Sequence, residues 1–246
     1  MSTALFVAAH PDDESLMSGV AIVEHAAAGI DVHVLVISPS VSSNVLGQLN
    51  GEAGSSVAPW WGVVHNPSAE GYAPLTADAF GQARLDETAA AVRAMGSGLG
   101  TITLHSAGLG GGWTAADAQA LILDVANSIT SGAVLLKTHS HIVDDHPDHI
   151  ATGQGARLLA AADPARFGNL RHYILPRYWA DPRLSNPAVV EHWDTPTDAT
   201  VAARAINGLR CYGAWAPPDS YAIGYHSVYI DMFAPLLATP KCLYHS

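Results

Sequence analysis

Short apolar runs alternate with a segment of helical periodicity at the start of the chain, and this alternation constrains the fold most strongly. Residues 4–9 (ALFVAA) form an apolar run that predicts a buried strand. Apolar side chains recur at helical spacing from Glu14 to Ala28, and residues 32–37 (VHVLVI) predict a second strand. Two strands joined by one helix form a right-handed β-α-β unit, so we expect them to be parallel.

The same alternation continues downstream and predicts a Rossmann-like α/β fold. Such a series forms an open, mostly parallel sheet with helices on both faces. We expect Thr114 to be the N-cap of one of the helices. The expected helices cover residues 78–95, 114–130 and 147–162, and the expected strands cover 101–105 and 133–138.

After residue 164 the pattern changes, although nothing marks a second domain. We expect strands over 171–179 and 189–193 and a helix over 197–209, followed by a tail rich in aromatic residues, Gly and Pro. No linker or internal repeat interrupts the chain. We therefore expect a single domain over residues 1–246, with an α/β core over 1–165 and a C-terminal α+β extension over 166–246.

A long irregular stretch over residues 39–75 follows the second strand. It is rich in Ser, Gly, Asn and Pro, and it contains Trp60 and Trp61. A loop of this length inside a compact domain is usually functional or mobile. Two interpretations stay open at this point: the tryptophans stack on a sugar or an aromatic group of a substrate, or they only pin the loop to the core.

The composition excludes several classes of protein. Of the 246 residues, 49% are hydrophobic and 13% are charged, which is the reverse of a disordered chain. No apolar run reaches the roughly 18 residues of a membrane span, and no basic cluster precedes the first apolar stretch, so we expect a cytoplasmic chain without a signal peptide. The net charge of −11 argues against binding to nucleic acid or to an acidic membrane. Cys211 and Cys242 are expected to be free thiols.

Two similar polar tetrads follow predicted strands. The first is His10-Pro11-Asp12-Asp13, and the second is His146-Pro147-Asp148-His149. Ligands of open α/β sheets bind outside the carboxyl ends of the strands, which is where both tetrads lie. A single His-Pro-Asp is often an ordinary turn with an Asp helix cap, but its occurrence twice after a strand favours a shared site.

The residue types in the tetrads favour a metal. His10, Asp13 and His149 together offer two imidazole nitrogens and one carboxylate, and three protein ligands plus a water are typical of a catalytic zinc site. We expect one Zn²⁺ per chain. Asp12 lies beside these ligands and is the candidate general base. His146 is the candidate to donate a proton or to stabilise an oxyanion.

Two acidic residues beside the tetrads have a simpler explanation. We assign Asp148 to capping or orienting its helix, and Glu14 to a helix N-terminus.

The tetrads resemble those of the LmbE-like (PIG-L) zinc-dependent deacetylases. Residues 84–87 (RLDE) are similar to that family's Arg-x-x-Glu helix, and residues 204–215 are similar to its C-terminal helix, with Arg in place of Lys. The resemblance covers most of the chain. It implies the metal ligands, base and acid named above, and it implies that Arg84 contacts the substrate.

The same resemblance implies a substrate class. Members remove acetyl groups from N-acetylglucosamine units of small molecules or lipids, or act as amidases on thiol-sugar conjugates. Because no membrane segment is expected, we predict a small-molecule N-acetylglucosamine conjugate from thiol metabolism or antibiotic biosynthesis. The family often has a Tyr just before the second tetrad, whereas residues 142–145 (IVDD) have none. In relatives the C-terminal segment closes over the metal, so His226 is the candidate replacement and substrate contact.

Three other classes compete with this interpretation. A metallo-β-lactamase-like hydrolase needs H-x-H-x-D-H, but here two extra residues separate His139 and His141 from His146, so we expect both histidines to line the pocket or support the ligands. A dinucleotide-binding loop at 108–112 lacks its last Gly, because that position is Trp113. A catalytically inert metal-binding relative would not need every ligand and base position that this chain retains.

Overall fold

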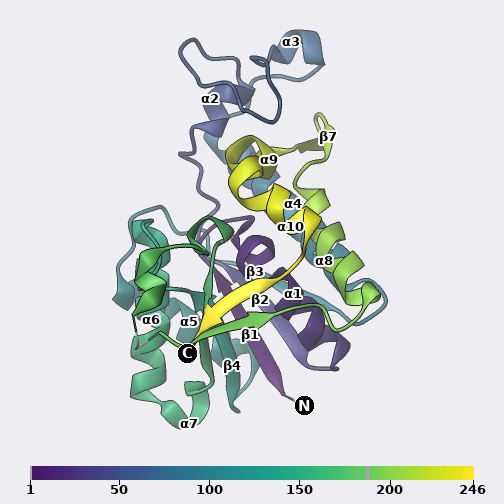
Figure 1. Ribbon diagram of the computed structural model, residues 1–246. Coiled ribbons are helices and arrows are strands. Elements are labelled where there is room, and N and C mark those ends of the chain that lie inside the picture. Colours follow the sequence, from purple (N-terminus) through teal and green to yellow (C-terminus); the bar gives the residue numbers. More distant parts are fainter. Residues whose placement is uncertain (1, 187–188) are drawn as a thin grey trace.

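A seven-stranded sheet runs through the protein, and helices cover both of its faces (Figure 1). The computed structural model describes residues 2–186 and 189–246. The strand order is β3-β2-β1-β4-β5-β9-β6; the first five strands are parallel, and β9 is antiparallel to both of its neighbours. The predicted α/β class is confirmed. The strands are β1 (Thr3–Ala8), β2 (Asp31–Val36), β3 (Ile102–Ser106), β4 (Val134–His139), β5 (Leu170–Ile174), β6 (Glu191–Asp194) and β9 (Cys242–His245).

The central strand β1 sets the position of the site. Its apolar residues are fully buried because helices cover both faces, which explains why the run is continuously apolar rather than alternating. The chain leaves β1 towards β2 on one side and reaches β4 on the other, with Thr3 paired to both Asp31 and Val134. The strand order therefore reverses between β1 and β4. Such a switch point opens a crevice at the carboxyl ends of the two strands.

Five long helices form the two outer layers. On one face, α1 (Asp13–Ala27), α4 (Ala77–Gly96) and α8 (Ala199–Cys211) bury one apolar cluster with the sheet. On the other face, α5 (Ala115–Ile129) and α6 (Pro147–Ala162) bury a second one. The last two helices approach closely at Gly155, where a Cβ atom would lie 2.7 Å from the carbonyl oxygen of Ala115. A larger residue would push α5 and α6 apart.

A capping box fixes the start of α5, and it confirms the prediction that Thr114 is the N-cap. The Thr114 hydroxyl accepts from the amide of Asp117, and the Asp117 carboxylate accepts from the amide of Thr114. Replacing Thr114 with Ala should lower the free energy of unfolding by about 1 kcal/mol. Urea denaturation measures this, and Thr114→Ser, which keeps the hydroxyl, should be close to the unchanged protein. Equal stability of the Ala variant would contradict a role for the cap.

The C-terminal third differs in detail from the sequence prediction. The strand expected over 171–179 ends at Ile174, because Pro176 begins the 3-10 turn η1 (Pro176–Tyr178). The last residues form β9, which lies between β5 and β6 and was not predicted. The division at residue 165 stays a prediction. The remaining short elements are α2 (Val45–Leu49), α3 (Pro67–Glu70), α7 (Pro164–Phe167), η2 (Pro182–Ser185), β7 (Trp215–Ala216), β8 (Ser220–Tyr221), α9 (Ile223–Val228), the π-helical η3 (Tyr229–Phe233) and α10 (Ala234–Ala238).

The 39–75 loop is anchored on the C-terminal segment. It holds only the short helices α2 and α3, at the end of the molecule that also carries α9 and β7 (Figure 1). The Trp60 ring packs edge-on against Tyr225 at 5.1 Å, and the Trp61 ring lies 4.6 Å from that of Trp215. These contacts match the interpretation in which the tryptophans pin the loop. None of the helices in the described part of the chain is long and apolar enough to cross a membrane.

Candidate active site

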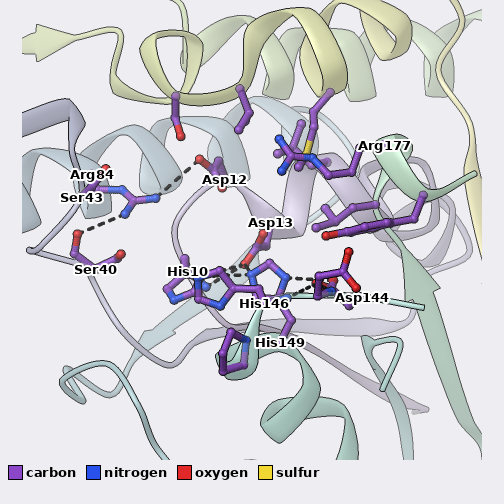
Figure 2. A pocket seen from close by; sticks show the side chains of 18 of the residues that line it. His10, Asp12, Asp13, Ser40, Ser43, Arg84, Asp144, His146, His149 and Arg177 are labelled. Carbon is purple, nitrogen blue, oxygen red and sulfur yellow. Dashed lines mark hydrogen bonds and ion pairs between the residues drawn. The ribbon is translucent and has the colours of Figure 1, made fainter. Parts of the chain in front are cut away.

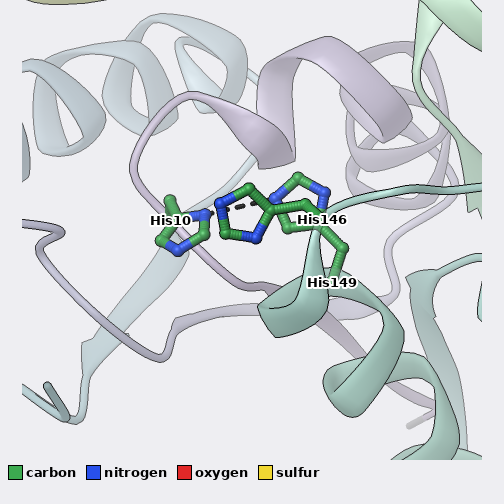
Figure 3. Close-up of side chains that lie close together, drawn as sticks. All are labelled: His10, His146 and His149. Atoms are coloured by element: carbon green, nitrogen blue, oxygen red, sulfur yellow. Dashed lines mark hydrogen bonds between the residues drawn. The ribbon is translucent and has the colours of Figure 1, made fainter. Parts of the chain in front are cut away.

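The crevice between β1 and β4 brings the two tetrads together. The chain turns at residues 10–12 after β1 and enters α1 at Asp13, while the second tetrad opens α6 at Pro147. His10 and His149 are 139 positions apart in sequence, yet their side chains lie next to each other (Figure 3). The parallel pairing of β1 and β4 is the reason, because it places both carboxyl ends at one edge of the sheet.

Three donor atoms form a nearly equilateral triangle. His10 Nδ1 lies 3.1 Å from His149 Nε2 and 3.6 Å from Asp13 Oδ2, and the last two atoms are 3.4 Å apart. Tetrahedral ligands with bonds of about 2.0–2.2 Å lie about 3.3–3.6 Å from one another. Two of the three separations lie in this range, and the third, between the two histidine nitrogens, is shorter by 0.2 Å. With Asp13 as the third donor, a small outward movement of the imidazoles fits the three atoms to a single zinc-sized ion. All three side chains are buried.

A carboxylate holds the outer nitrogen of each histidine. His10 Nε2 is 3.1 Å from Asp148 Oδ2. His149 Nδ1 is 3.0 Å from Asp144 Oδ2 (Figure 2). A carboxylate accepts a proton, so the outer nitrogens carry hydrogen and the inner nitrogens face Asp13 with free lone pairs. This is the arrangement that orients histidines toward a metal.

The electrostatics of the triangle favour a cation. Burial raises the pKa of Asp13, but His149, His139 and His10 overcome this and hold it well below its usual range. Burial lowers the pKa of His149, but Asp13 and Asp144 overcome this and raise it. The negative groups therefore attract positive charge to the point where the three donors meet.

Removing one of the supporting carboxylates should weaken metal binding. We expect Asp148→Asn to lower metal affinity about 10- to 100-fold, because His10 loses the acceptor that orients it. Competition with a chromogenic chelator measures the affinity. Asp145→Asn is the matched control, since Asp145 lines the same pocket but pairs with Arg183 rather than with a histidine. Equal affinity of the two variants would contradict the supporting role.

Asp12 is held in a strained turn beside the triangle. Its φ of 96° lies in a region that non-glycine residues rarely adopt, and such strain is typical of functional sites. Burial raises the pKa of its carboxyl well above the ordinary value, while Arg84 opposes the shift. A carboxylate with a raised pKa is better matched to proton transfer near neutral pH. Asp12 as the general base stays a prediction, and the raised pKa agrees with it.

The guanidinium of Arg84 forms hydrogen bonds mainly with backbone carbonyl groups. It donates to the carbonyl oxygens of Pro11 at 2.9 Å, Ser40 at 3.3 Å and Pro39 at 3.4 Å, and it lies 3.5 Å from the Asp12 carboxylate. These bonds tie the Asp12 turn to the start of the 39–75 loop. Arg84 also lines the pocket, so its predicted contact with substrate stays a prediction.

His146 lies at the open side of the triangle. Its ring stacks on that of His149 at 4.6 Å and meets that of His10 at 4.8 Å (Figure 3). His146 Nδ1 accepts from the amide of Asp148, so the neutral ring carries its hydrogen on Nε2. Burial and the charges of His149 and His10 lower its pKa. An exposed N–H donor thus stands next to the metal-ligand candidates.

A pocket of about 530 Å³ opens above these residues. This volume is in the range of small-molecule sites. Hydroxyl groups line one wall and the C-terminal segment contributes another (Figure 2). The walls include Ser40, Ser42, Ser43 and Asn44 from the loop, Arg177 and Tyr178 from η1, and Ser227, Val228 and Met232 from the C-terminal segment.

Three other histidines named from the sequence lie outside the triangle. His139 is fully buried with its Nε2 3.3 Å from Asp13 Oδ2, but that nitrogen also accepts from the amide of Ala9 at 3.1 Å. His141 packs against His172 instead. His139 and His141 therefore do not build a metallo-β-lactamase-like site. The structure does not bring His226 to the pocket that contains the tetrads, because it is buried under the 39–75 loop.

Sequence reasoning missed the contacts of three acidic residues around the tetrads. Asp148 does more than cap α6, since it holds both His10 and the amide of Gly112. Asp144, which carried no assignment, holds His149. Glu14 is fully buried and accepts from the Tyr212 hydroxyl at 2.6 Å, which ties α1 to the end of α8. The density of acids around the second tetrad was the available signal for the first two.

The sequence also matches a described protein family. Residues 5–160 match the PIG-L model, whose description is GlcNAc-PI de-N-acetylase. The chain belongs to the PIG-L family. All three donor atoms of the triangle and Asp12 lie within the matched range.

Curated PIG-L relatives include two deacetylases from Rhodococcus. The 1D-myo-inositol 2-acetamido-2-deoxy-alpha-D-glucopyranoside deacetylase of Rhodococcus jostii (strain RHA1) is 32% identical over 164 residues, which cover 59% of this chain and 49% of that protein. The enzyme of the same name from Rhodococcus opacus (strain B4) is 30% identical over 173 residues, covering 64% and 52%. The chain thus spans about half the length of the curated relatives it matches.

Solved structures share the fold at low sequence identity. A triple mutant of a deacetylase of the teicoplanin biosynthetic pathway superimposes with a TM-score of 0.56 at 14% identity, covering 100% of this chain and 97% of that one. GalB, the 4-carboxy-2-hydroxymuconate hydratase of Pseudomonas putida KT2440, gives 0.55 at 22% identity, covering 92% and 83%. At this level of identity, these likenesses show the fold alone.

Proposed function

We propose that this chain is a zinc-dependent hydrolase that removes the N-acetyl group from an N-acetylglucosamine unit in a small-molecule conjugate. The observation that carries the proposal is the triangle of His10, Asp13 and His149 at the base of a pocket, with a buried carboxylate beside it. Membership of the PIG-L family and the names of the Rhodococcus relatives, which are deacetylases, support the amide substrate.

The three donors of the triangle would hold the zinc ion. When bound there, zinc supplies a Lewis acid that polarises the amide carbonyl and lowers the pKa of water in the site. Asp12 takes the proton of the attacking water, and its burial keeps the pair out of bulk solvent. Arg84 holds the Asp12 turn in place through the carbonyl of Pro11.

His146 stabilises the charge that develops in the reaction. The backbone amide of Asp148 donates to its Nδ1, so its Nε2 carries the hydrogen and would donate to the oxyanion that forms on the acetyl oxygen. The proton that Asp12 took from the water passes to the departing sugar amine as the C–N bond breaks, which returns Asp12 to its carboxylate form. The products are acetate and a free amino sugar.

The pocket walls support an amino-sugar conjugate. The serine hydroxyls at 40, 42 and 43 both donate and accept hydrogen bonds, which matches the hydroxyl groups of a sugar. We propose a conjugate of thiol metabolism or of antibiotic biosynthesis. The Rhodococcus relatives are named for an acetamidodeoxyglucosyl-inositol substrate, and one structural neighbour is named for the teicoplanin biosynthetic pathway.

Release of free amine from a panel of substrates tests the proposal. The panel contains N-acetylglucosaminyl-inositol, an N-acetylglucosaminyl glycopeptide and N-acetylglucosamine alone, each assayed after removal of metal and after addition of zinc. Release that depends on zinc is expected from at least one conjugate. Absence of amine from every member, with zinc shown to be bound, would contradict the deacetylase. Hydration of an unsaturated acid by the same preparation would place the chain with GalB instead.

A further inference from the structure

A second pair of histidines faces each other outside the pocket of the tetrads. His65 belongs to the 39–75 loop and His226 to α9, and both are almost completely buried, at 4% and 2% exposure. His65 Nε2 lies 2.8 Å from His226 Nε2. The contact joins two segments that are 161 positions apart in sequence.

The outer nitrogens fix the tautomer of both rings. His65 Nδ1 is 2.7 Å from Glu70 Oε2, and His226 Nδ1 is 2.7 Å from the carbonyl oxygen of Ala222. A carboxylate and a carbonyl only accept hydrogen bonds, so each Nδ1 carries a hydrogen. A neutral imidazole has one hydrogen only, and each Nε2 is then a bare acceptor. Two bare acceptors repel at 2.8 Å unless a cation lies between them.

Aromatic rings around the pair favour positive charge. The His65 ring lies against both Trp61, at 5.0 Å, and Trp215, at 4.7 Å, each with an interplanar angle of 26°, and the two indole rings also touch each other at 4.6 Å. Indole faces attract cations. The Glu70 carboxylate adds a negative charge on the far side of His65. The environment therefore stabilises a cation held by the two rings.

The distance identifies the cation as a proton. An N–H···N hydrogen bond spans about 2.7–3.2 Å, so 2.8 Å accommodates a proton without movement. Two ligands of a tetrahedral metal lie about 3.3 Å apart, and zinc sites use three or four protein ligands. Among the described residues, this pair does not belong to any group of three metal-binding side chains.

We propose that His65 and His226 share one proton, and that this proton fastens the 39–75 loop to α9. Ser227 and Val228, which follow His226, line the pocket of the tetrads, and so do residues 40 and 42–44 at the start of the loop. The shared proton thus holds together two walls of that pocket. The proposal is independent of the hydrolase chemistry.

The groups around the pair set the direction of the pH dependence. Burial lowers the pKa of His226 to about 4, against the effect of the Ala222 carbonyl and with a further contribution from His65, so His226 does not hold the proton by itself at higher pH. Glu70, whose pKa His65 lowers against the effect of burial, stays ionised. Burial raises the pKa of Tyr225 to about 12 and raises that of Tyr72, so both phenols stay neutral. As the pH rises, loss of the single proton leaves two facing lone pairs, and the loop is released.

Limited proteolysis and ¹⁵N NMR of the full chain test this inference. Cleavage within residues 57–64 should accelerate at least about tenfold as the pH rises through the titration of the pair, because cleavage follows the open population. In ¹⁵N spectra His65 and His226 should titrate together in one step. In His226→Gln the cleavage rate should no longer change with pH, whereas His192→Gln, at an exposed position, should behave like the unchanged chain.

A milder variant keeps the test decisive if His226→Gln unfolds. Glu70→Gln removes the negative charge beside His65, so the pH at which the loop is released should be lower than in the unchanged chain. Below that pH the loop should still be closed. Independent titration of the two histidines, or a cleavage rate of the unchanged chain that does not vary with pH, would overturn the inference. A second bound metal ion per chain that is lost in His226→Gln would also overturn the inference, because a metal would then occupy the place of the proton.

Discussion

The variant Asp12→Asn is expected to lose about a hundred- to ten-thousand-fold in kcat while it keeps its metal. The amide of asparagine has the size of the carboxylate but cannot take the proton of the attacking water. Asparagine also tolerates a positive φ better than most residues, so the turn at 96° should persist. Steady-state release of amine, together with metal content by elemental analysis, measures both parts of the prediction.

Two comparisons separate loss of the base from loss of the fold. Asp145→Asn makes the same chemical change at another position of the pocket and should retain most of the activity. Asp12→Ala should lose activity to a similar extent, and it should also unfold more easily because alanine adopts this φ at greater cost. Full turnover of Asp12→Asn would exclude Asp12 as the base.

The second large effect is expected for His149→Ala. This change removes one corner of the triangle and leaves the Asp144 carboxylate without its imidazole partner. Metal content after gel filtration should fall at least about tenfold, since two remaining ligands do not retain zinc against dilution. Turnover should fall with it.

His146→Ala provides the matched control for metal loss. His146 is the neighbouring histidine of the same tetrad and stacks on the same ring, but it stands outside the triangle. We expect this variant to keep its metal and to lose turnover alone. Unchanged metal content in His149→Ala, or loss of metal in His146→Ala as severe as in His149→Ala, would require a different set of ligands.

The sequence predicted the elements that local patterns determine. The spacing of apolar residues identifies β1, α1 and β2, and the N-cap residue Thr114 identifies the start of α5. Each of these signals lies within a few neighbouring residues. The four residues of β9 carry no such pattern. Their place in the sheet depends on pairing with β5, about 70 positions earlier, and with β6, about 50 positions earlier. Local periodicity does not encode such pairing.

The site divides in a similar way. The repeated tetrad marked His10, Asp13 and His149 because each tetrad lies between a buried strand and the helix that follows it, and the sheet then fixes their meeting point. His226 could not be placed from the sequence, because its partner His65 lies in a loop without a regular pattern. Arg84 was assigned to substrate by resemblance, whereas its bonds to backbone carbonyls appear only once the loop is folded against α4.

The reversal of strand order between β1 and β4 separates the residues that the sheet holds in place from segments that can vary in length. The donors of the triangle follow these two central strands, so their spacing is inherited from the sheet and any change there disturbs the whole core. The walls of the pocket come from the segments after β2 and β5 and from the tail, which lie outside that pairing. Insertions in those segments can therefore reshape the pocket walls while the spacing of the donors stays unchanged. A chimera that exchanges residues 39–75 between relatives would therefore transfer selectivity without rebuilding the reactive centre.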